Sequence, residues 1–509
     1  MAKQNFEYLT DEQVLRLHRA ALEILADTGL LVRNQKARRR FAEHGCTVDD
    51  ETENVRFPAE LVEKCLELAP PTFTLHGRDP AYDVTIPRHE PVVVTASSAP
   101  DIIDPVSGNT RRATSDDIAR IAKLINELEG FDVFSISTLA DDAPDDQFSL
   151  SRFYPALKNC VKPCRTSVID LKEVEQVLKL GALIAGSEAT FKERPFITFG
   201  YCSIVSPLTM DFDSTEMLMY YAENELPAYG TVAPVGGAGT PYTLAGTLAL
   251  INAEWLATCV LTQISKAGRP MIYNFLPVFC DMRDGAYAPG AIETGIMNSA
   301  ICQMARFYNI PAGGYLGLTN SKISDAQAGV EKSMSPLMGT LSGVDYIVMG
   351  GLLDALMTFD FGQAVIDNEI ALMLKRVVRG IEFSEQNLAL DEINKAGPAG
   401  MFIGNPETFD RMNTTCFLPD VADRNMRETW EVLGSSDIHT RALRKARDIL
   451  TKPSHKAISE KIDRNIRDAF EGLVKGDATA PAGWTPPTEA PKRKRQNRRN
   501  QSKQPATST

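Results

Sequence analysis

Histidine is scarce in this chain of 509 residues, and the six histidines lie at positions 18, 44, 76, 89, 439 and 455. None therefore falls between residues 90 and 438. A zinc or iron centre held by histidines, a Ser-His-Asp triad and a histidine general base are not expected in that central part. A carboxylate-rich metal site is left open by the composition but has no signature spacing. We expect no bound metal.

The nine cysteines are scattered and form no CxxC pair. A disulfide framework or a four-cysteine zinc site is therefore not expected, and the reduced cytoplasm is the predicted compartment. Cys160 and Cys164 are close enough in the sequence to share a metal. The preferred interpretation is that both are buried, inert thiols.

Long apolar runs and nucleotide-binding motifs are also missing. No run of eighteen uncharged apolar residues occurs, and the polar N-terminus does not resemble a secretion signal, so no membrane association is predicted. Residues 236–239, Gly-Gly-Ala-Gly, fail the last glycine of GxGxxG and are interpreted as a loop after the fifth strand. Residues 437–442 superficially match a corrinoid-binding DxHxxG pattern without its final glycine, and we interpret them as part of a helix.

The net charge of −12 is unevenly distributed. Residues 492–509 contain seven basic residues and no acidic one, so the rest of the chain is acidic and is not expected to bind nucleic acid. The basic tail could dock an acidic protein or bind RNA, but simple solvation is the preferred interpretation. Deletion of residues 476–509 should then leave turnover intact.

Hydrophobic periodicity predicts four segments. Residues 1–90 form a helical N-terminal extension, with a capping box at Thr10 and Gln13, further helices near 34–43 and 58–68, and an extended piece near 82–86. Residues 91–380 alternate strands with amphipathic helices, which predicts an α/β fold, a (β/α)₈ TIM barrel. Residues 381–475 are predicted to be helical and packed on the barrel, and 476–509 to be a disordered tail.

The predicted elements of the barrel alternate regularly. The expected strands are 92–98, 132–139, 163–169, 196–204, 228–235, 270–278, 311–318 and 345–350. The expected helices lie near 115–128, 146–158, 171–186, 214–224, 243–266, 291–307, 325–342 and 362–378. Active sites in this fold lie at the carboxyl ends of the strands.

Aromatic residues are frequent near those predicted strand ends, and a set of rings suits a quaternary ammonium through cation–π contacts. The aromatic candidates for substrate binding are Tyr201, Tyr273, Phe275, Phe279 and Tyr315, although each could simply fill the core. The polar candidates are Asp281, Arg283, Asn320, Lys322 and Gln327. Arg283 or Lys322 could pair with a substrate carboxylate, with surface solvation as the alternative. No catalytic residue is assigned.

Several segments resemble the trimethylamine methyltransferase (MttB-like) family. The resemblance spans roughly residues 8–470 and is most specific in residues 317–331, which include Thr-Asn-Ser-Lys and Asp-Ala-Gln-Ala-Gly. It also includes Asn252-Ala-Glu254, residues 281–285, residues 9–13 and 29–32, and Gly397-Pro-Ala-Gly400. Residues 401–408 depart from the pattern, because many relatives have a histidine-containing segment there.

The resemblance implies a TIM barrel that moves a methyl group from an amine to Co(I) of a separate corrinoid protein, with no cofactor bound permanently. Founding members use pyrrolysine, at a position in or near Ser321–Ser324, where this chain has ordinary residues. Members without pyrrolysine act on quaternary amines such as glycine betaine. Such a substrate needs no general acid, because its leaving group is already a neutral amine.

The leading hypothesis is a methyltransferase for glycine betaine or a related betaine. Trimethylamine, carnitine or proline betaine as the donor is the first alternative. A non-catalytic binder of quaternary amines, or a barrel lyase or hydrolase, is the second. A homo-oligomer is expected.

Overall fold

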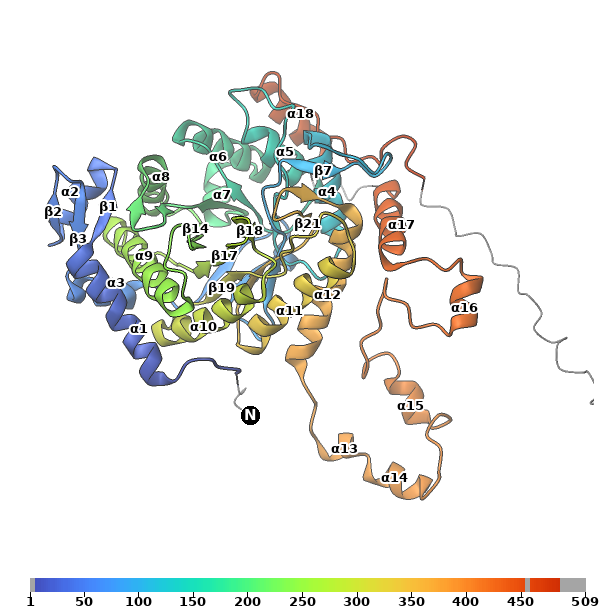
Figure 1. Cartoon of the computed structure of the whole chain (residues 1–509). Coiled ribbons are helices and arrows are strands. Elements are labelled where there is room, and N and C mark those ends of the chain that lie inside the picture. Colours follow the sequence, from blue (N-terminus) through green and yellow to red (C-terminus); the bar gives the residue numbers. More distant parts are fainter. Residues whose placement is uncertain (1–4, 454–457, 486–509) are drawn as a thin grey trace, which may run out of the picture.

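The computed structural model describes residues 5–453 and 458–485 (Figure 1). The N-terminal segment combines helices with short strands. Thr10 and Gln13 form the predicted capping box of the first helix. Strands of three residues contain too little alternation to be recognised, so only the extended piece near 82–86 was predicted. The helical elements are α1 (Asp11–Glu23), η1 (Ile24–Thr28), α2 (Gln35–Glu43), α3 (Ala59–Leu68) and η2 (Pro80–Tyr82), and the strands are β1 (Leu30–Val32), β2 (Thr47–Asp49), β3 (Asn54–Arg56), β4 (Phe73–Leu75) and β5 (Val84–Ile86).

Parallel strands occupy the centre of the molecule, and each overlaps one of the strands predicted from the sequence (Figure 1). They form two four-stranded sheets, in the orders β14-β11-β10-β9 and β16-β19-β20-β6. Parallel bridges from Val94 to Val133 and from Val232 to Phe275 link the two sheets. The strands are β6 (Val92–Val94), β9 (Phe134–Ser135), β10 (Cys164–Ser167), β11 (Ile197–Tyr201), β14 (Ala228–Gly230), β16 (Tyr273–Phe275), β19 (Ala312–Tyr315) and β20 (Tyr346–Val348).

A helix follows each of these strands, which confirms the predicted α/β alternation. Many of the helices begin at a side-chain cap, as Asp211, Asp325 and Asp360 show. The helices lie outside the strands and bury the outer face of the sheets (Figure 1). They are α4 (Ser115–Glu127), α5 (Leu150–Asn159), α6 (Leu171–Ala185), α7 (Glu188–Glu193), α8 (Phe212–Glu223), α9 (Leu244–Ser265), α10 (Ile292–Tyr308), α11 (Ala326–Leu341) and α12 (Phe361–Arg379).

Further short strands lie between the carboxyl end of a parallel strand and the next helix. They make the connections at this end long and structured, which is the end where a parallel α/β fold places its ligands. The added strands are β7 (Asp101–Ile103), β8 (Thr110–Arg112), β12 (Ile204–Val205), β13 (Thr209–Met210), β15 (Val235–Gly236), β17 (Val278–Asp281), β18 (Ala286–Ala288), β21 (Leu352–Leu353) and β22 (Thr358–Phe359).

Helix α9 is the one helix among the described residues that is long and apolar enough to cross a membrane. In the protein 72% of its most apolar stretch is buried, and α1, α3 and α8 pack against it. Its composition is therefore accounted for by its central place among other helices.

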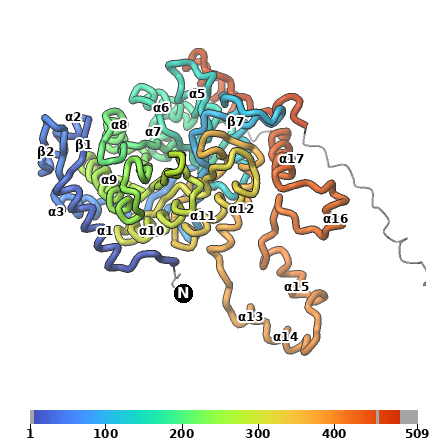
Figure 2. The backbone as a smooth tube through the Cα atoms, in the orientation of Figure 1, coloured from blue at the N-terminus to red at the C-terminus, as the bar shows by residue number. Residues whose placement is uncertain are grey.

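The C-terminal region differs from the expectation that residues 381–475 pack on the barrel as a whole. Helices α17 and α18 contact the body, α17 against α12 and α4, and α18 against α6. Residues 381–419 instead extend away from the body as an arm (Figure 2). The elements are α13 (Glu385–Leu388), α14 (Leu390–Ala396), α15 (Pro406–Arg411), α16 (Arg427–Val432), α17 (Ile438–Thr451) and α18 (Glu460–Ala469).

Packing of the chain on the body continues beyond residue 475, after which a disordered tail was predicted. Residues 476–485, which the sequence placed in a disordered tail, lie against the body. Trp484 is buried and its ring lies 5.6 Å from that of Phe361, while the Arg447 side chain donates to the Trp484 carbonyl. A single buried indole outweighs a polar, proline-rich composition. The basic residues 492–509 lie outside the described residues.

Candidate active site

The inner face of the parallel strands, the face turned away from the helices, collects tyrosines and one arginine. Side chains alternate along a strand, so the face of each residue can be read from its neighbours. On β11, Phe199 stacks on Tyr221 of α8, so Gly200 lies on the inner face. A Cβ at Gly200 would lie 2.8 Å from Nη2 of Arg165, which places Arg165 on the inner face as well.

Three tyrosines from different strands surround Arg165. The Arg165 Cζ lies 4.6 Å from the ring centroid of Tyr229. The rings of Tyr229 and Tyr346 meet edge to face, with centroids 5.4 Å apart, and their hydroxyls are hydrogen-bonded. Tyr315 is a hydrogen-bonding neighbour of the Arg165 side chain. Burial raises the pKa of Tyr229 and of Tyr346, so both phenols stay neutral.

A free thiol and a further tyrosine extend this group toward the carboxyl ends of the strands, and the inner-face group of Arg165, Cys202, Tyr229, Tyr287, Tyr315 and Tyr346 is called the tyrosine recess below. Cys202 follows Gly200 by two residues, is exposed, and lies close enough to Arg165 to feel its charge. Burial nevertheless raises the pKa of the Cys202 thiol. Tyr287 of β18 lies within electrostatic reach of Tyr315, and burial raises the pKa of Tyr287 to about 12.

Asn274 adds an amide to the inner face. Its Nδ2 donates to Thr231 Oγ1 at 2.7 Å, while its Oδ1 is buried without a hydrogen-bond partner. The structure therefore places an unused acceptor on the same face as Arg165. The sequence analysis did not select Asn274 or Thr231, because an Asn or Thr within an apolar strand has no distinctive spacing.

Three of the aromatic candidates face the helices. The Tyr273 hydroxyl donates to Asn252 Oδ1 at 2.9 Å, and its ring packs on Trp255 of α9. Phe275 lies beside Tyr273, with ring centroids 4.6 Å apart. Tyr201 lies next to Tyr221 of α8, with centroids 6.3 Å apart. These rings thus fill the layer between strands and helices, the alternative that the sequence left open.

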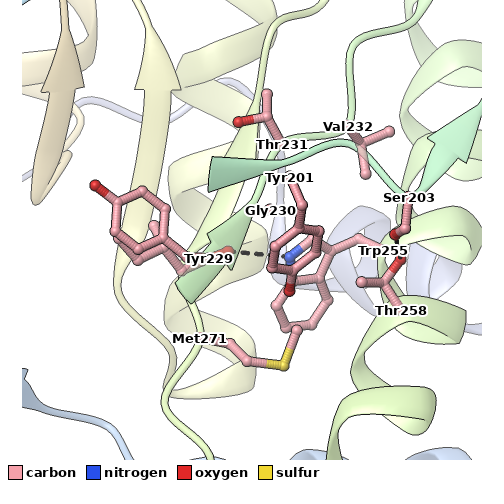
Figure 3. Close-up of a pocket in the computed structure, with 10 residues that line it drawn as sticks. Tyr201, Ser203, Tyr229, Gly230, Thr231, Val232, Trp255, Thr258 and Met271 are labelled. Atoms are coloured by element: carbon pink, nitrogen blue, oxygen red, sulfur yellow. Dashed lines mark hydrogen bonds between the residues drawn. The ribbon is translucent and has the colours of Figure 1, made fainter. Parts of the chain in front are cut away.

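A small cavity adjoins Tyr201, but it is too small for a substrate (Figure 3). Its volume is about 10 Å³, the space of one water molecule. In Figure 3 Tyr201 and Trp255 crowd together, while Tyr229 extends away to the other side of its strand. The Trp255 indole donates to the Ile272 carbonyl at 3.0 Å, which fixes this wall.

Phe279, Asp281 and Arg283 lie together beside an open groove of about 500 Å³ on the β17–β18 hairpin. Phe279 packs edge to face on Tyr242. Hydrogen bonds from Arg283 lower the pKa of Asp281 to about 2, and Arg283 is 89% exposed. The two charges satisfy each other at the surface. Arg283 therefore lies outside the tyrosine recess.

Asn320 and Lys322 belong to the connection after β19, and Gln327 belongs to the first turn of α11. Glu331 of α11 organises this region. The Glu331 carboxylate accepts from the Thr319 hydroxyl at 2.6 Å, the Asn320 amide at 2.8 Å and the Gln327 side chain at 3.0 Å. Asn320 Nδ2 also donates to the Tyr287 carbonyl, which ties this connection to β18. Lys322 is 70% exposed and donates to the Asn320 carbonyl.

Two buried carboxylates that support these connections were not selected from the sequence. Asp367 of α12 pairs with Lys332 of α11, and the Lys332 ammonium also donates to the carbonyls of Gly317 and Leu352. Glu254 of α9 accepts from Ser206 Oγ and the Leu208 amide, both at 2.8 Å. Burial raises the pKa of Glu254 to about 7. Their spacing within helices gives no sign of these partners.

The remaining motifs have structural roles. Cys160 and Cys164 are buried and burial raises both thiol pKa values, as expected for inert thiols. Residues 437–442 form the cap and first turn of α17, as predicted, and His439 lies 2.9 Å from Asp360. Residues 236–239 lie in the connection before α9. No cluster of three or more potential metal ligands occurs among residues 5–453 and 458–485.

Comparison with known proteins gives a consistent result over most of the chain. A family model described as trimethylamine methyltransferase (MTTB) matches residues 2–471. The chain belongs to the trimethylamine methyltransferase family. A trimethylamine methyltransferase of Desulfitobacterium hafniense is 31% identical over 462 residues, which cover 91% of this chain and 93% of that protein. A glycine betaine methyltransferase of the same species is 32% identical over 428 residues, covering 84% and 88%.

A solved monomethylamine methyltransferase from Methanosarcina barkeri is also similar. It has a TM-score of 0.48 and 14% sequence identity, over 93% of this chain and 97% of that one. The membership in the trimethylamine methyltransferase family identifies the chain as a methyltransferase.

The segment Ser321–Ser324 is tied to its surroundings by hydrogen bonds. Ser321 Oγ donates to Asp325 Oδ1 at 2.9 Å, and Ser324 Oγ donates to Gln363 Oε1 at 2.7 Å. Both serines therefore hold the connection after β19 in place. The Asn252-Ala-Glu254 motif acts similarly, since Asn252 binds Tyr273 and Tyr308 while Glu254 holds the β12–β13 hairpin.

Proposed function

We propose that this methyltransferase moves a methyl group from a quaternary amine of the glycine betaine type to Co(I) of a separate corrinoid protein. The compartment that fits its free thiols is the cytoplasm. We further propose that the eight parallel strands form a closed (β/α)₈ barrel. The cyclic sequence of ladders and bridges, from β6 through β9 to β20 and back to β6, supports closure.

The clustering of tyrosines on the inner face of the strands is the observation that carries this proposal. Tyr229, Tyr315 and Tyr346 present rings on the inner face, and Tyr287 extends the series toward the carboxyl ends of the strands. Aromatic faces attract a quaternary ammonium by roughly 0.5–2 kcal/mol each. All six histidines lie outside residues 90–438, so this recess suits a transfer that requires no histidine acid or base.

An apolar rim around the recess supports docking of a corrinoid. Seven of the eight connections that follow the parallel strands each present one large apolar side chain that is between 47% and 62% exposed. A flat, partly apolar macrocycle would cover such side chains, because all of them lie on connections at the carboxyl ends of the parallel strands. The rim residues are Val106, Ile169, Val205, Tyr242, Met282, Ile323 and Met357.

The reaction balances without a proton. A corrinoid bound at the rim supplies Co(I), a strong nucleophile for the methyl carbon. The tyrosines desolvate the ammonium and hold one N–CH₃ bond in line with the opening. When the N–CH₃ bond breaks, its electron pair stays on nitrogen and leaves a neutral tertiary amine. Rings that bind the cation only moderately do not oppose this loss of charge, whereas a contacting carboxylate would.

The alternatives differ in the donor or in whether transfer occurs. Trimethylamine, carnitine and proline betaine would use the same rings. A non-catalytic binder would bind the amine without any effect of cobalamin. Methyl transfer is distinguished from binding alone because only a methyltransferase releases a demethylated product.

The experiment is to incubate the full-length chain with glycine betaine and cob(I)alamin and to quantify dimethylglycine by mass spectrometry. We expect dimethylglycine to accumulate with cob(I)alamin and not with oxidised hydroxocobalamin. If neither glycine betaine nor the alternative donors yields a demethylated amine, including with corrinoid proteins added, the proposal is wrong.

We also propose that the chain forms a homo-oligomer. The arm of residues 381–419 carries exposed apolar side chains, among them Ile381, Phe383, Met401, Phe402, Ile403 and Phe409. A second copy of the chain would bury them. Light scattering should give a mass at least twice that of the 55.9 kDa monomer, and deletion of the arm should lower it.

A further inference from the structure

Arg165 is a buried cation whose hydrogen-bonding capacity is largely unused. Only 4% of the residue is exposed, and neither Nε nor Nη1 has a hydrogen-bond partner. Its neighbours are the phenol groups of Tyr229, Tyr315 and Tyr346 and the thiol of Cys202. No Asp or Glu among residues 5–453 and 458–485 forms an ion pair with it, and burial raises the pKa of Tyr229, Tyr346 and Cys202, so these three neighbours supply no counter-charge.

The other buried cations of the described chain are better satisfied. Six lysines and arginines are buried there, and five have several strong partners. Arg38 pairs with Asp50 and Glu53, and Lys332 pairs with Asp367. The Lys162 ammonium donates to three carbonyl groups, Lys123 donates to two, and Arg152 donates to Ser98, Thr166 and the Ser167 carbonyl. Arg165 is the exception.

A buried guanidinium without a counter-charge is costly, and the cost falls when an anion binds. Guanidinium groups match carboxylates geometrically, because two parallel N–H groups can donate to the two oxygens. In Arg165 Nε and Nη2 form one such pair and Nη1 and Nη2 the other, so each edge of the guanidinium has one donor without a partner. The absence of a side chain at Gly200 leaves room for the guanidinium, since a Cβ there would lie 2.8 Å from Nη2.

We propose that Arg165 is a specificity-determining residue that binds the carboxylate of a zwitterionic betaine at the inner end of the recess. The inference rests on the proposed function and names its substrate class. The carboxylate lies at Arg165, and the trimethylammonium group points toward Tyr287 and the apolar rim. This orientation presents an N–CH₃ group to the outside, where the methyl acceptor binds.

The same charge selects against other methylamines. Tetramethylammonium and protonated trimethylamine are cations without a carboxylate, so Arg165 repels them across a region of low dielectric. Glycine betaine carries both charges on a short skeleton, and its carboxylate neutralises Arg165 while the rings contact its ammonium. The recess therefore favours zwitterions over simple cations.

The test is calorimetric titration of the full-length chain with matched ligand pairs. Glycine betaine is compared with tetramethylammonium, carnitine with choline, and proline betaine with N,N-dimethylpyrrolidinium. We expect the wild type to bind at least one zwitterion roughly 10- to 100-fold more tightly than its carboxylate-free partner, the range for charged hydrogen bonds. Arg165→Gln should weaken zwitterion binding by a similar factor and bring the ratio close to one.

Three further variants separate recognition from stability. Gly200→Ala retains Arg165 but displaces its guanidinium, and should also reduce the ratio. Arg38→Gln removes a buried arginine that is already paired, and should lower the melting temperature while keeping the ratio. Arg165→Lys keeps the charge without the fork and should fall between wild type and Arg165→Gln.

The outcomes distinguish this inference from the proposed function. Equal binding of zwitterion and simple cation by the wild type, no binding of any betaine, or an unchanged ratio in folded Arg165→Gln would overturn the role of Arg165. Binding that depends on Arg165 without dimethylglycine formation would support the carboxylate site and contradict the methyltransferase proposal. Demethylation that Arg165→Gln leaves unchanged would do the reverse.

Discussion

Lys332 and Asp367 form an ion pair 3.2 Å long in which both side chains are completely buried. The pair joins α11 to α12, and its remaining hydrogen bonds reach Gly317, Gly351 and Leu352 at the carboxyl ends of β19 and β20. Burial raises the pKa of Asp367 despite the neighbouring ammonium. The pair thus fixes the connections that carry Tyr315 and the Ser321 segment.

Removal of one partner should be strongly destabilising. Lys332→Met leaves the Asp367 carboxylate buried without a counter-charge, and we expect a loss of about 3–5 kcal/mol in unfolding free energy. Lys192→Met is the control, because Lys192 pairs with Glu188 at the surface and should cost less than about 1 kcal/mol. Urea denaturation measures both. A loss under 1 kcal/mol for Lys332→Met would show that the pair contributes little.

Glu254 should make stability depend on pH. Its pKa rises from 4.5 when unfolded to about 7 when folded, because burial disfavours the charged form. A raised acid pKa means that the stabilising contribution is full below pH 4.5 and is lost as pH rises through 7. Over this window the wild type should lose about 3 kcal/mol relative to Glu254→Gln, which does not ionise.

Unfolding of both proteins from pH 4.5 to 8 isolates this effect, since all other groups titrate alike. The unfolding free energy of the wild type should fall relative to that of Glu254→Gln as pH rises. A constant difference across that range would mean that Glu254 keeps an ordinary pKa.

The contribution of the C-terminal residues to stability should end at residue 485. Trp484→Ala removes a buried indole that packs on Phe361, and we expect a loss of about 3–5 kcal/mol. The sequence alone predicted that deletion of 476–509 leaves turnover intact. The contacts of Trp484 lead us to expect a lower melting temperature for that deletion, whereas deletion of 486–509 removes none of the described contacts. Calorimetry of the two truncations decides whether residue 485 is the boundary.

The sequence predicted the succession of elements well, and the physical reason is simple. Each parallel strand is an apolar run bounded by turn residues, and each helix has an amphipathic period and often a capping residue. The orientation of the strand side chains was not predictable in the same way. Strands buried on both faces, such as β6 and β20, have apolar or aromatic residues on both, so their sequence does not reveal which residues face inward.

That loss of alternation explains which site residues were missed. Tyr273 and Phe275 were selected, whereas their neighbour Asn274 is the residue on the inner face. Tyr315 was selected and does face inward. Arg165 was overlooked because a charged residue within Cys164–Ser167 is typical of an exposed strand, and only the register with β11 shows that it is buried.

Tyrosines on the inner face of the strands and tyrosines between strands and helices should respond differently to substitution. Tyr315→Leu removes a ring of the recess, and we expect KM for the quaternary amine to rise roughly 2- to 30-fold, the equivalent of one cation–π contact. Tyr201→Leu and Tyr273→Leu remove rings between strands and helices, so they should lower the melting temperature and leave KM unchanged. Steady-state kinetics at a temperature well below each transition separates the effects. If Tyr201→Leu raised KM as much as Tyr315→Leu, the recess would have to lie on the helix side of the strands.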